Sequence, residues 1–221
     1  MNDCACNKGI PANHTMDYEI GLWKKGFTNV AGVDEAGRGS LLGSVVAAAV
    51  ILPQGTYIHG IRDSKTLSAN KRETLYEAII KTALSWGIGI VNETIIDKIN
   101  IKQATRLAMK LAVKDLDIEV DHILVDAETI PVPTPQTGLI KGDIISYSIS
   151  AASIIAKVTR DRMCMLWHEE FPNYGIASNK GYYTKEHLES LLKYGPCPIH
   201  RRSFIRKPLL KHSNLTFNFG S

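Results

Sequence analysis

Residues 29–52 read NVAGVDEAGRGSLLGSVVAAAVIL, and the expected fold class follows from them. Two runs rich in Val, Ala and Ile, at residues 29–34 and 44–52, are separated by a turn rich in glycine. Short apolar runs bounded by glycine are typical of strands, and the lack of polar alternation in the second run predicts burial on both faces. The stretch therefore predicts two core strands, close enough in the chain to form a hairpin.

The rest of the chain alternates between the apolar spacings of helices and strands. Ser68 and Asn100 are the predicted N-caps of two of the helices. We expect strands at residues 86–91 and 122–126, and helices at 18–25, 68–83, 100–114, 148–171 and 184–194. This alternation favours an α/β fold with a mixed central sheet flanked by helices, plus a small C-terminal helical region.

Length and composition bound the domain organisation. The chain has 221 residues, of which 22% are charged and 44% hydrophobic, as in ordinary globular proteins. We expect one domain at residues 29–205, a loosely ordered lead-in at 1–28 and a tail at 206–221. The longest apolar run, at 45–52, has eight residues, whereas a membrane span needs about 20. Without a signal-like N-terminus, these features predict a cytoplasmic protein with no membrane segment.

Basic charge is concentrated near the C-terminus. The formal net charge of the whole chain is only +4, yet residues 180–221 carry eight Lys or Arg against two Glu. A mildly acidic body with a basic flank suits an enzyme that acts on a polyanion, and a solvated basic tail is the alternative. Charge alone does not decide between these two interpretations.

Asp34 and Glu35 are the first candidates for chemistry, because they terminate the first apolar run directly before the glycine turn. Adjacent carboxylates at the end of a buried strand repel each other and lose hydration, and a divalent cation between them relieves both costs. The alternative is a solvated strand end followed by a turn, since paired acids near turns are common.

Two further acids are expected near this pair. Asp126 ends the strand at 122–126, and ligands gather at the strand ends of α/β sheets. Ser153, Lys157 and Asp161 are spaced four residues apart and so share a helix face, as part of a site or as a surface stripe. Four carboxylates without a Cys or His cluster favour Mg²⁺ or Mn²⁺, and two such ions can promote phosphodiester hydrolysis.

Several motifs together resemble the ribonuclease HII family over residues 30–204. They are Asp-Glu-Ala-Gly-Arg-Gly at 34–39, Asp-Ser-Lys at 63–65, Val-Asp at 125–126, Ala-Ala-Ser-Ile-Ile-Ala-Lys-Val at 151–158, Arg-Asp at 160–161, Lys-Gly-Tyr at 180–182 and His-Arg-Arg-Ser-Phe at 200–204. The resemblance implies a ribonuclease H-like catalytic domain with a two-metal site formed by Asp34, Glu35, Asp126 and Asp161.

The resemblance also implies an activity. Members of this family are endonucleases that hydrolyse the phosphodiester 5′ to ribonucleotides, leaving 3′-hydroxyl and 5′-phosphate ends. The expected partners are RNA/DNA hybrids and duplex DNA with embedded ribonucleotides, so that misincorporated ribonucleotides and RNA primers are removed, and we expect a monomer. By the same resemblance, the substrate-binding residues are Gly37, Arg38, Gly39, Lys65, Ser153, Lys157, Lys180 and Tyr182.

Each part of this implied site has its own task. The turn at residues 37–39 contacts the ribonucleotide, whose 2′-hydroxyl is read, and glycine permits the close backbone approach. Tyr182 packs on the deoxyribose beyond it, and the lysines neutralise phosphates. Arg201 and Arg202 either hold the duplex backbone or are simply solvated.

The chain departs from the family pattern in places, and other functions stay open. Ser40 and Ser44 stand where prolines are common, and Ala127 replaces the glycine after the third acid. Tyr183 leaves open which of two neighbouring rings meets the sugar. The alternatives are a non-catalytic nucleic-acid-binding module of the same fold, or another two-metal nuclease such as a junction resolvase.

Overall fold

The computed structural model describes residues 16–61 and 64–206 of the chain. At its centre lies a five-stranded sheet with the strand order β3-β2-β1-β4-β5. β2 runs antiparallel to both of its neighbours, whereas β4 runs parallel to both of its own, so the sheet is mixed as predicted. The strands are β1 (Val30–Ala36), β2 (Val45–Ile51), β3 (Ser85–Val91), β4 (His122–Asp126) and β5 (Gln136–Leu139).

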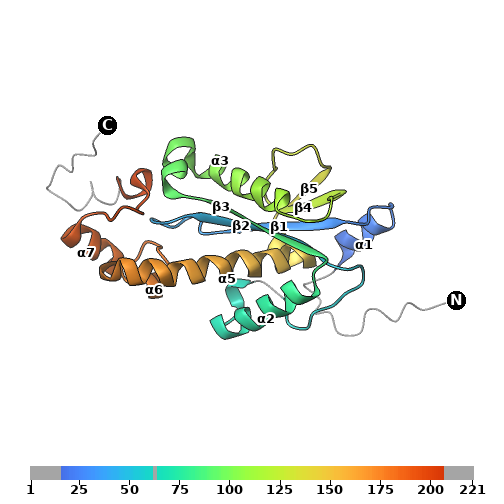
Figure 1. Cartoon of the computed structure of the whole chain (residues 1–221), viewed down its shortest axis with the longest axis horizontal. Coiled ribbons are helices and arrows are strands. Elements are labelled where there is room, and N and C mark those ends of the chain that lie inside the picture. Colours follow the sequence, from blue (N-terminus) through green and yellow to red (C-terminus); the bar gives the residue numbers. More distant parts are fainter. Residues whose placement is uncertain (1–15, 62–63, 207–221) are drawn as a thin grey trace.

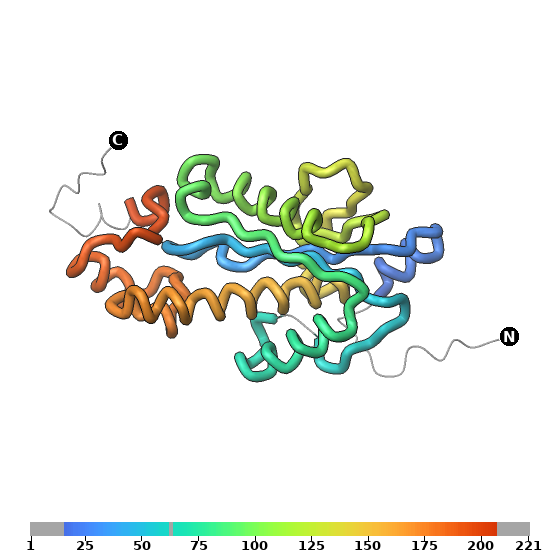
Figure 2. The backbone as a smooth tube through the Cα atoms, viewed as in Figure 1, coloured from blue at the N-terminus to red at the C-terminus, as the bar shows by residue number. Residues whose placement is uncertain are grey.

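Helices cover both faces of this sheet. α3 lies on one face, and α5 and α2 lie on the other, as Figures 1 and 2 show. Each face carries its own apolar cluster between strands and helices. No helix in the described part of the chain is long and apolar enough to span a bilayer. The helices are α1 (Asp17–Trp23), α2 (Ala69–Thr82), α3 (Glu93–Lys114), α4 (Gly142–Ile145), α5 (Tyr147–Glu170), α6 (Ile176–Asn179) and α7 (Lys185–Tyr194), with 3₁₀ turns η2 (Ser64–Thr66) and η3 (Pro172–Tyr174).

The close approach of α3 to the sheet depends on glycine. A Cβ atom on Gly89 of β3 would lie 1.9 Å from the carbonyl oxygen of Ala108, and one on Gly87 would lie 2.3 Å from that of Ala112. Real atoms cannot come so close, so any side chain at these positions would push α3 away from β3.

The helix predicted from Asn100 starts earlier than expected. α3 already begins at Glu93, where the Asn92 side chain accepts a hydrogen bond of 3.0 Å from the Ile95 amide. Asn100 has a φ of 66° and kinks the helix, while its side chain accepts from the Gln103 amide. Asn100 therefore does cap a helical segment, but a second capping asparagine adds another segment before it.

Residues 16–28 are ordered, in contrast to the loose lead-in expected at 1–28, whose first 15 residues lie outside the described part. α1 packs on the domain through the buried side chains of Glu19 and Leu22. Glu19 Oε1 accepts hydrogen bonds of 2.7 Å from Ser146 Oγ and 2.9 Å from the Ser148 amide, at the start of α5. A carboxylate at a helix N-terminus complements its partial positive charge, which anchors α1.

β5 is absent from the predicted elements. It follows Pro131, Pro133 and Pro135, has only four residues and forms by pairing with β4. The Gln136 side chain bonds to both the amide and the carbonyl of Ile130, at 2.7 and 2.9 Å, and so closes the loop before it. Asp63 and residues 207–221 of the expected tail lie outside the described residues.

Candidate active site

Strand register brings Asp34 and Asp126 together. Val33 of β1 lies opposite Val125 of the parallel strand β4, and the next residue on each strand is an acid. Asp34 is buried, with only 5% of its surface exposed. β1 continues to Ala36 by pairing with β2, so Asp34 and Glu35 lie within the strand and do not end it as predicted.

These acids are crowded and poorly hydrated. Burial raises the pKa of Asp34 well above its usual value, and the neighbouring carboxylates of Glu35 and Asp126 raise it further. Burial also raises the pKa of Glu35 to about 7, although Arg38 opposes the shift. The pKa of Asp126 is raised mainly by burial. Three acids in this state are costly to ionise, and a nearby cation stabilises their charged forms.

A glycine turn holds the Asp126 carboxylate. The Gly142 amide donates a hydrogen bond of 2.7 Å to Asp126 Oδ1. A Cβ atom on Gly142 would lie 2.7 Å from Ile149 Cδ1 and 3.3 Å from Asp126 Oδ1, so this amide is closely packed against the carboxylate that it binds. Ala127, the next residue after Asp126, has a φ of 48°, the left-handed conformation that glycine adopts readily and alanine does not.

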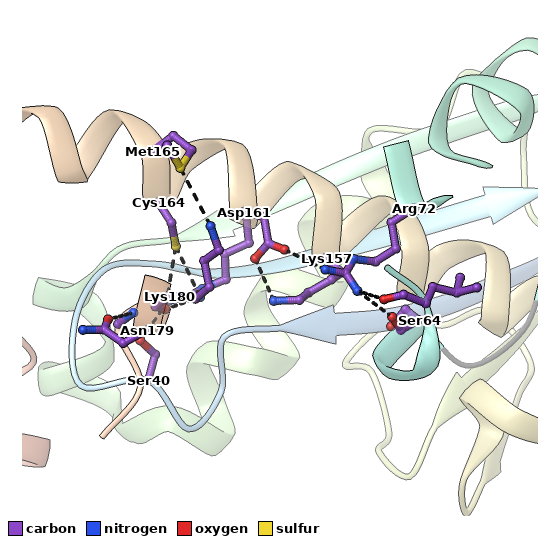
Figure 3. Close-up of polar contacts among 12 residues, drawn as sticks. Ser40, Ser64, Arg72, Lys157, Asp161, Cys164, Met165, Asn179 and Lys180 are labelled. Atoms are coloured by element: carbon purple, nitrogen blue, oxygen red, sulfur yellow. Dashed lines mark hydrogen bonds and ion pairs between the residues drawn. The ribbon is translucent and has the colours of Figure 1, made fainter. Parts of the chain in front are cut away.

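Asp161 is held by two cationic side chains (Figure 3). Lys157 Nζ lies 2.7 Å from Asp161 Oδ1, and Arg72 Nη2 lies 3.5 Å from Asp161 Oδ2. Arg72 also donates to the carbonyl oxygens of Ser64 and Leu67. It thereby connects the segment around η2 to the acid on α5. The predicted stripe of Ser153, Lys157 and Asp161 thus contains an ion pair. It is also part of the site, because Ser153 and Lys157 line the same cleft as the other acids.

Serine hydroxyls connect the same elements at a deeper level. Ser153 on α5 lies within hydrogen-bonding distance of Ser64, with 2.9 Å between the two Oγ atoms, and also bonds to Asp34, which lowers the pKa of that acid. Lys65 Nζ lies 2.8 Å from Oδ2 of the buried Asp143. Side-chain contacts thus connect β1, η2, α4 and α5 near Asp34.

An open cleft of about 540 Å³ gathers most of the predicted site residues. Asp161 and Lys180 are not among its lining residues. Asp161 pairs with Lys157 and Arg72, which line the cleft, whereas Lys180 Nζ lies 3.8 Å from Met165 Sδ (Figure 3). The cleft is lined by Asp34, Glu35, Ala36, Gly37, Arg38, Gly39, Ser64, Lys65, Arg72, Asp126, Ser153, Lys157 and Tyr182.

The glycine turn forms one wall of the cleft. Gly37 has a φ of 88°, which favours glycine. The Arg38 side chain lies 3.0 Å from Glu128 Oε1 and 3.6 Å from Glu35 Oε1, and so joins the turn to the acids.

Tyr182 stands on a supported turn, and its ring is the one that lines the cleft. His187 donates through Nδ1 to the Tyr182 carbonyl over 2.9 Å, and its Nε2 lies 3.1 Å from His200 Nε2. His200 Nδ1 accepts from the Cys197 amide, so a chain of hydrogen bonds with one direction runs through two neutral rings. Burial lowers the pKa of both histidines, that of His200 to about 4. Tyr183 is half exposed and is not among the lining residues.

The donor set fits a divalent cation, although it is not assembled as a finished cage. Within residues 16–61 and 64–206, no three His, Cys, Asp or Glu side chains are grouped closely enough to hold a metal ion. Asp161 is engaged by Lys157 and Arg72, and Asp126 by Gly142. Buried, mutually repelling carboxylates are nevertheless the oxygen donors that hard cations take.

The structure adds site residues that sequence reasoning missed. Arg72, Asp143 and Glu128 each bind a predicted site residue. The sequence around Asp143 carried no signal for this role, because its partner Lys65 lies 78 positions away. Arg201, considered as a duplex contact, is fully buried and binds backbone carbonyls instead.

Comparisons with known proteins agree with this geometry. The family model described as ribonuclease HII matches residues 31–207. The chain is 56% identical to a ribonuclease HII of Alkaliphilus oremlandii (strain OhILAs), over 88% of this chain and 99% of the relative. It is 55% identical to one of Bacillus subtilis (strain 168), over 85% of this chain and 73% of the relative. The crystal structure of ribonuclease H2 from Pyrococcus horikoshii OT3 matches with a TM-score of 0.70 and 28% identity, over 83% of this chain and 98% of that one. The chain therefore belongs to the ribonuclease HII family.

Proposed function

We propose that this protein is a metal-dependent endonuclease that hydrolyses the phosphodiester 5′ to a ribonucleotide, in RNA/DNA hybrids and in duplex DNA. The products carry 3′-hydroxyl and 5′-phosphate ends, as needed to remove misincorporated ribonucleotides and RNA primers. The observation that carries this proposal is the shared cleft of three crowded acids, Asp34, Glu35 and Asp126, and the turn at residues 37–39.

The proposed metal ligands are Asp34, Glu35, Asp126 and Asp161, and the cation is Mg²⁺ or Mn²⁺. When bound at these residues, a pair of such ions would supply an activated water and would neutralise charge on the phosphate. The chain itself contributes position: Gly142 orients Asp126, and Ser153 orients Asp34. Lys157 and Arg72 fix the position of the Asp161 carboxylate through their ion pairs.

Recognition of the ribonucleotide is assigned to Gly37, Arg38 and Gly39. Glycine leaves room for a sugar to approach the backbone, and the 2′-hydroxyl is the group that distinguishes RNA from DNA. Tyr182 is proposed to pack on the following deoxyribose, since it lines the same cleft and 39% of its surface is exposed.

Phosphate contacts are assigned to Lys65, Lys157 and Ser153, which line the cleft, and to Lys180. Such contacts set the register of the duplex without reading sequence. Lys180 needs a side-chain rotation away from Met165 to serve in this way.

We also propose that the protein acts as a monomer. Its substrates are formed wherever DNA is copied, which in a bacterial cell is the cytoplasm. Size-exclusion chromatography with light scattering tests the first statement, because a dimer would double the mass of 24.4 kDa.

The proposal is tested with three labelled substrates: an RNA/DNA hybrid, a DNA duplex with one embedded ribonucleotide, and a branched DNA junction. Each is incubated with Mg²⁺, with Mn²⁺ and with a chelator. We expect metal-dependent cleavage of the first two only. Cleavage of the junction alone would favour a resolvase, and binding without cleavage in either metal would indicate a non-catalytic module.

A matched pair of variants tests the role of Tyr182. Tyr182→Ala should lower kcat/KM on the single-ribonucleotide duplex by about tenfold, since the ring would lose an apolar contact with the sugar of about 1.5 kcal/mol. Tyr183→Ala removes a neighbouring ring that lies outside the cleft lining and should leave kcat/KM unchanged. An equal loss of kcat/KM in both variants would contradict a specific role of Tyr182 in recognition.

A further inference from the structure

Arg160 and Arg201 are the two largest fully buried side chains in the described part of the chain. Neither forms an ion pair with any described carboxylate. Burial, together with the charge of Arg160, lowers the pKa of Arg201 to about 9. A buried charge without an ionic partner is costly. The hydrogen bonds of these two guanidinium groups must therefore offset the cost of burying them.

Arg201 binds the loop between β1 and β2 from its inner side. Its Nη2 donates to the Gly37 carbonyl at 2.8 Å, and its Nη1 donates to the Arg38 carbonyl at 3.0 Å. Its Nε donates to the Gly43 carbonyl at 2.8 Å. The rigid fork of one guanidinium group thus fixes three peptide planes of this loop.

Peptide geometry gives this arrangement a consequence for the cleft. In a trans peptide the carbonyl points opposite to the amide N–H of the next residue, and the described chain has no cis peptide. Because the carbonyls of Gly37 and Arg38 are directed at Arg201, the amides of Arg38 and Gly39 point away from it. Neither amide has a hydrogen-bond acceptor among the described residues. Both residues line the cleft, so the turn offers it two donors.

Arg160 connects this turn to the Tyr182 segment. Its Nη1 donates to the Lys180 carbonyl at 2.9 Å, and its guanidinium lies 5.7 Å from the centre of the Tyr182 ring. A Cβ atom on Gly37 would lie 1.9 Å from Arg160 Nε, so the turn rests directly on this side chain. One guanidinium group therefore fixes the distance between the turn and the ring.

We propose that Arg201 and Arg160 are positioning residues for ribonucleotide recognition. Arg201 holds the Gly37 and Arg38 carbonyls inward, so that the Arg38 and Gly39 amides face an oxygen acceptor of the ribose in the cleft. Arg160 holds the Tyr182 ring at a set distance from these amides. This inference rests on the proposed function and specifies which atoms read the substrate.

Lysine is the informative replacement, because it keeps the charge and loses the fork. A lysine ammonium cannot hold three carbonyls in the geometry of a guanidinium group, so the amides of the turn lose their fixed direction. Errors of about 1 Å in placement cost up to about a hundredfold in rate. For Arg201→Lys we expect kcat on the single-ribonucleotide duplex to fall by about tenfold or more, and KM to rise as the preference for this duplex is lost.

The experiment compares Arg201→Lys and Arg160→Lys with Arg162→Lys. Arg162 is an exposed arginine on the same helix as Arg160 and pairs with Glu73, so its replacement is the matched control. Calorimetry measures Mn²⁺ binding, and Kd is measured in Ca²⁺ for the ribonucleotide duplex and for the all-DNA duplex. We expect unchanged Mn²⁺ affinity in all three variants. The preference for the ribonucleotide duplex should be lost in the first two only.

A measurement on the wild-type protein covers the case in which these variants do not fold. Amide hydrogen exchange of Arg38 and Gly39 should be fast in the free protein. It should slow on binding the ribonucleotide duplex in Ca²⁺, and not on binding the all-DNA duplex. Slow exchange of both amides in the free protein would overturn the proposal, because they would then be paired within the fold.

Two further outcomes separate this inference from the proposed function. If the wild-type protein does not cleave the ribonucleotide duplex, the proposed function itself fails. If the wild type cleaves it and Arg201→Lys keeps both kcat and the ratio of the two Kd values, only the positioning inference is overturned. A loss that merely follows the melting temperature, equal on all substrates, would assign the arginines a structural role and also overturn it.

Discussion

Lys157 Nζ lies 2.7 Å from Asp161 Oδ1, one helical turn along α5, and holds a carboxylate that we assign to the metal site. Arg72 Nη2 approaches the other oxygen of Asp161 at 3.5 Å. Both cationic side chains are mostly buried, so they are weakly screened by salt. A metal ion that uses Asp161 therefore has to compete with two fixed positive charges.

Arg72→Lys should impair the site by releasing the segment that contains Ser64. Arginine reaches two carbonyls and the Asp161 carboxylate at once, and lysine cannot. We expect a loss of about 1–3 kcal/mol in unfolding free energy, measured by urea denaturation, and a fall in kcat. Lys71→Met, a change at the adjacent residue of α2, serves as the control. Equal kcat values for both variants would count against the connection.

Asp126→Asn should separate catalysis from folding. Asparagine keeps an oxygen that accepts from the Gly142 amide, but it removes one of three crowded negative charges. We expect kcat to fall on the order of 10³-fold, which corresponds to a loss of several kcal/mol of transition-state stabilisation. The Kd for the hybrid should change little. The melting temperature should stay level or rise, because repulsion with Asp34 is relieved. A parallel loss of binding and turnover would contradict the assignment.

Ala127→Gly should stabilise the protein. Ala127 is exposed and has a φ of 48°, so its methyl group strains the backbone and contributes no packing. Relief of the left-handed conformation is worth about 1–2 kcal/mol, and the greater flexibility of unfolded glycine offsets about 0.5–1 kcal/mol. Urea denaturation should show a net gain of up to about 1 kcal/mol. A decrease in stability would mean that alanine is not strained here.

The neutral histidine pair predicts a pH dependence. The pKa of His200 is lowered from 6.5 to about 4, so the folded state favours the uncharged ring. This contribution is complete above pH 6.5 and is lost as the pH falls from 6.5 towards 4, up to about 3 kcal/mol. Unfolding free energies of the wild type and His200→Asn should therefore differ more at pH 7.5 than at pH 4.5.

The difference between the two proteins isolates this effect. Asp34 and Glu35 have raised pKa values and stabilise the fold towards low pH, which is the opposite sign. They are present in both proteins, so their contribution cancels in the comparison. A difference that stays constant between pH 4.5 and 7.5 would mean that His200 titrates alike in the folded and unfolded states.

The acids and the strands that carry them could be predicted from local sequence. Asp34, Glu35 and Asp126 each follow a short apolar run, and the parallel pairing of β1 with β4 brings them together, although β1 continues beyond its two acids. Asp161 was predicted by its helical spacing from Lys157 and by the family resemblance. These features depend on residues close in the chain, where periodicity carries information.

The supports of the site could not be predicted in this way. Arg201 contacts Gly37 across 164 positions of sequence, and Arg160 contacts Ser40 across 120. A buried arginine that binds carbonyls has the same sequence appearance as a solvated one, because only the folded backbone provides its partners. β5 escaped prediction for a similar reason, since pairing with β4 forms it and its own composition does not.

The most direct test of the account is to map the incision in an end-labelled DNA duplex with one embedded ribonucleotide, beside an all-DNA duplex of the same sequence. We predict a single metal-dependent cut on the 5′ side of the ribonucleotide, with a 3′-hydroxyl on the upstream fragment and the all-DNA duplex intact. A cut in the all-DNA duplex, a cut on the 3′ side, or an intact ribonucleotide duplex in both Mg²⁺ and Mn²⁺ would contradict it.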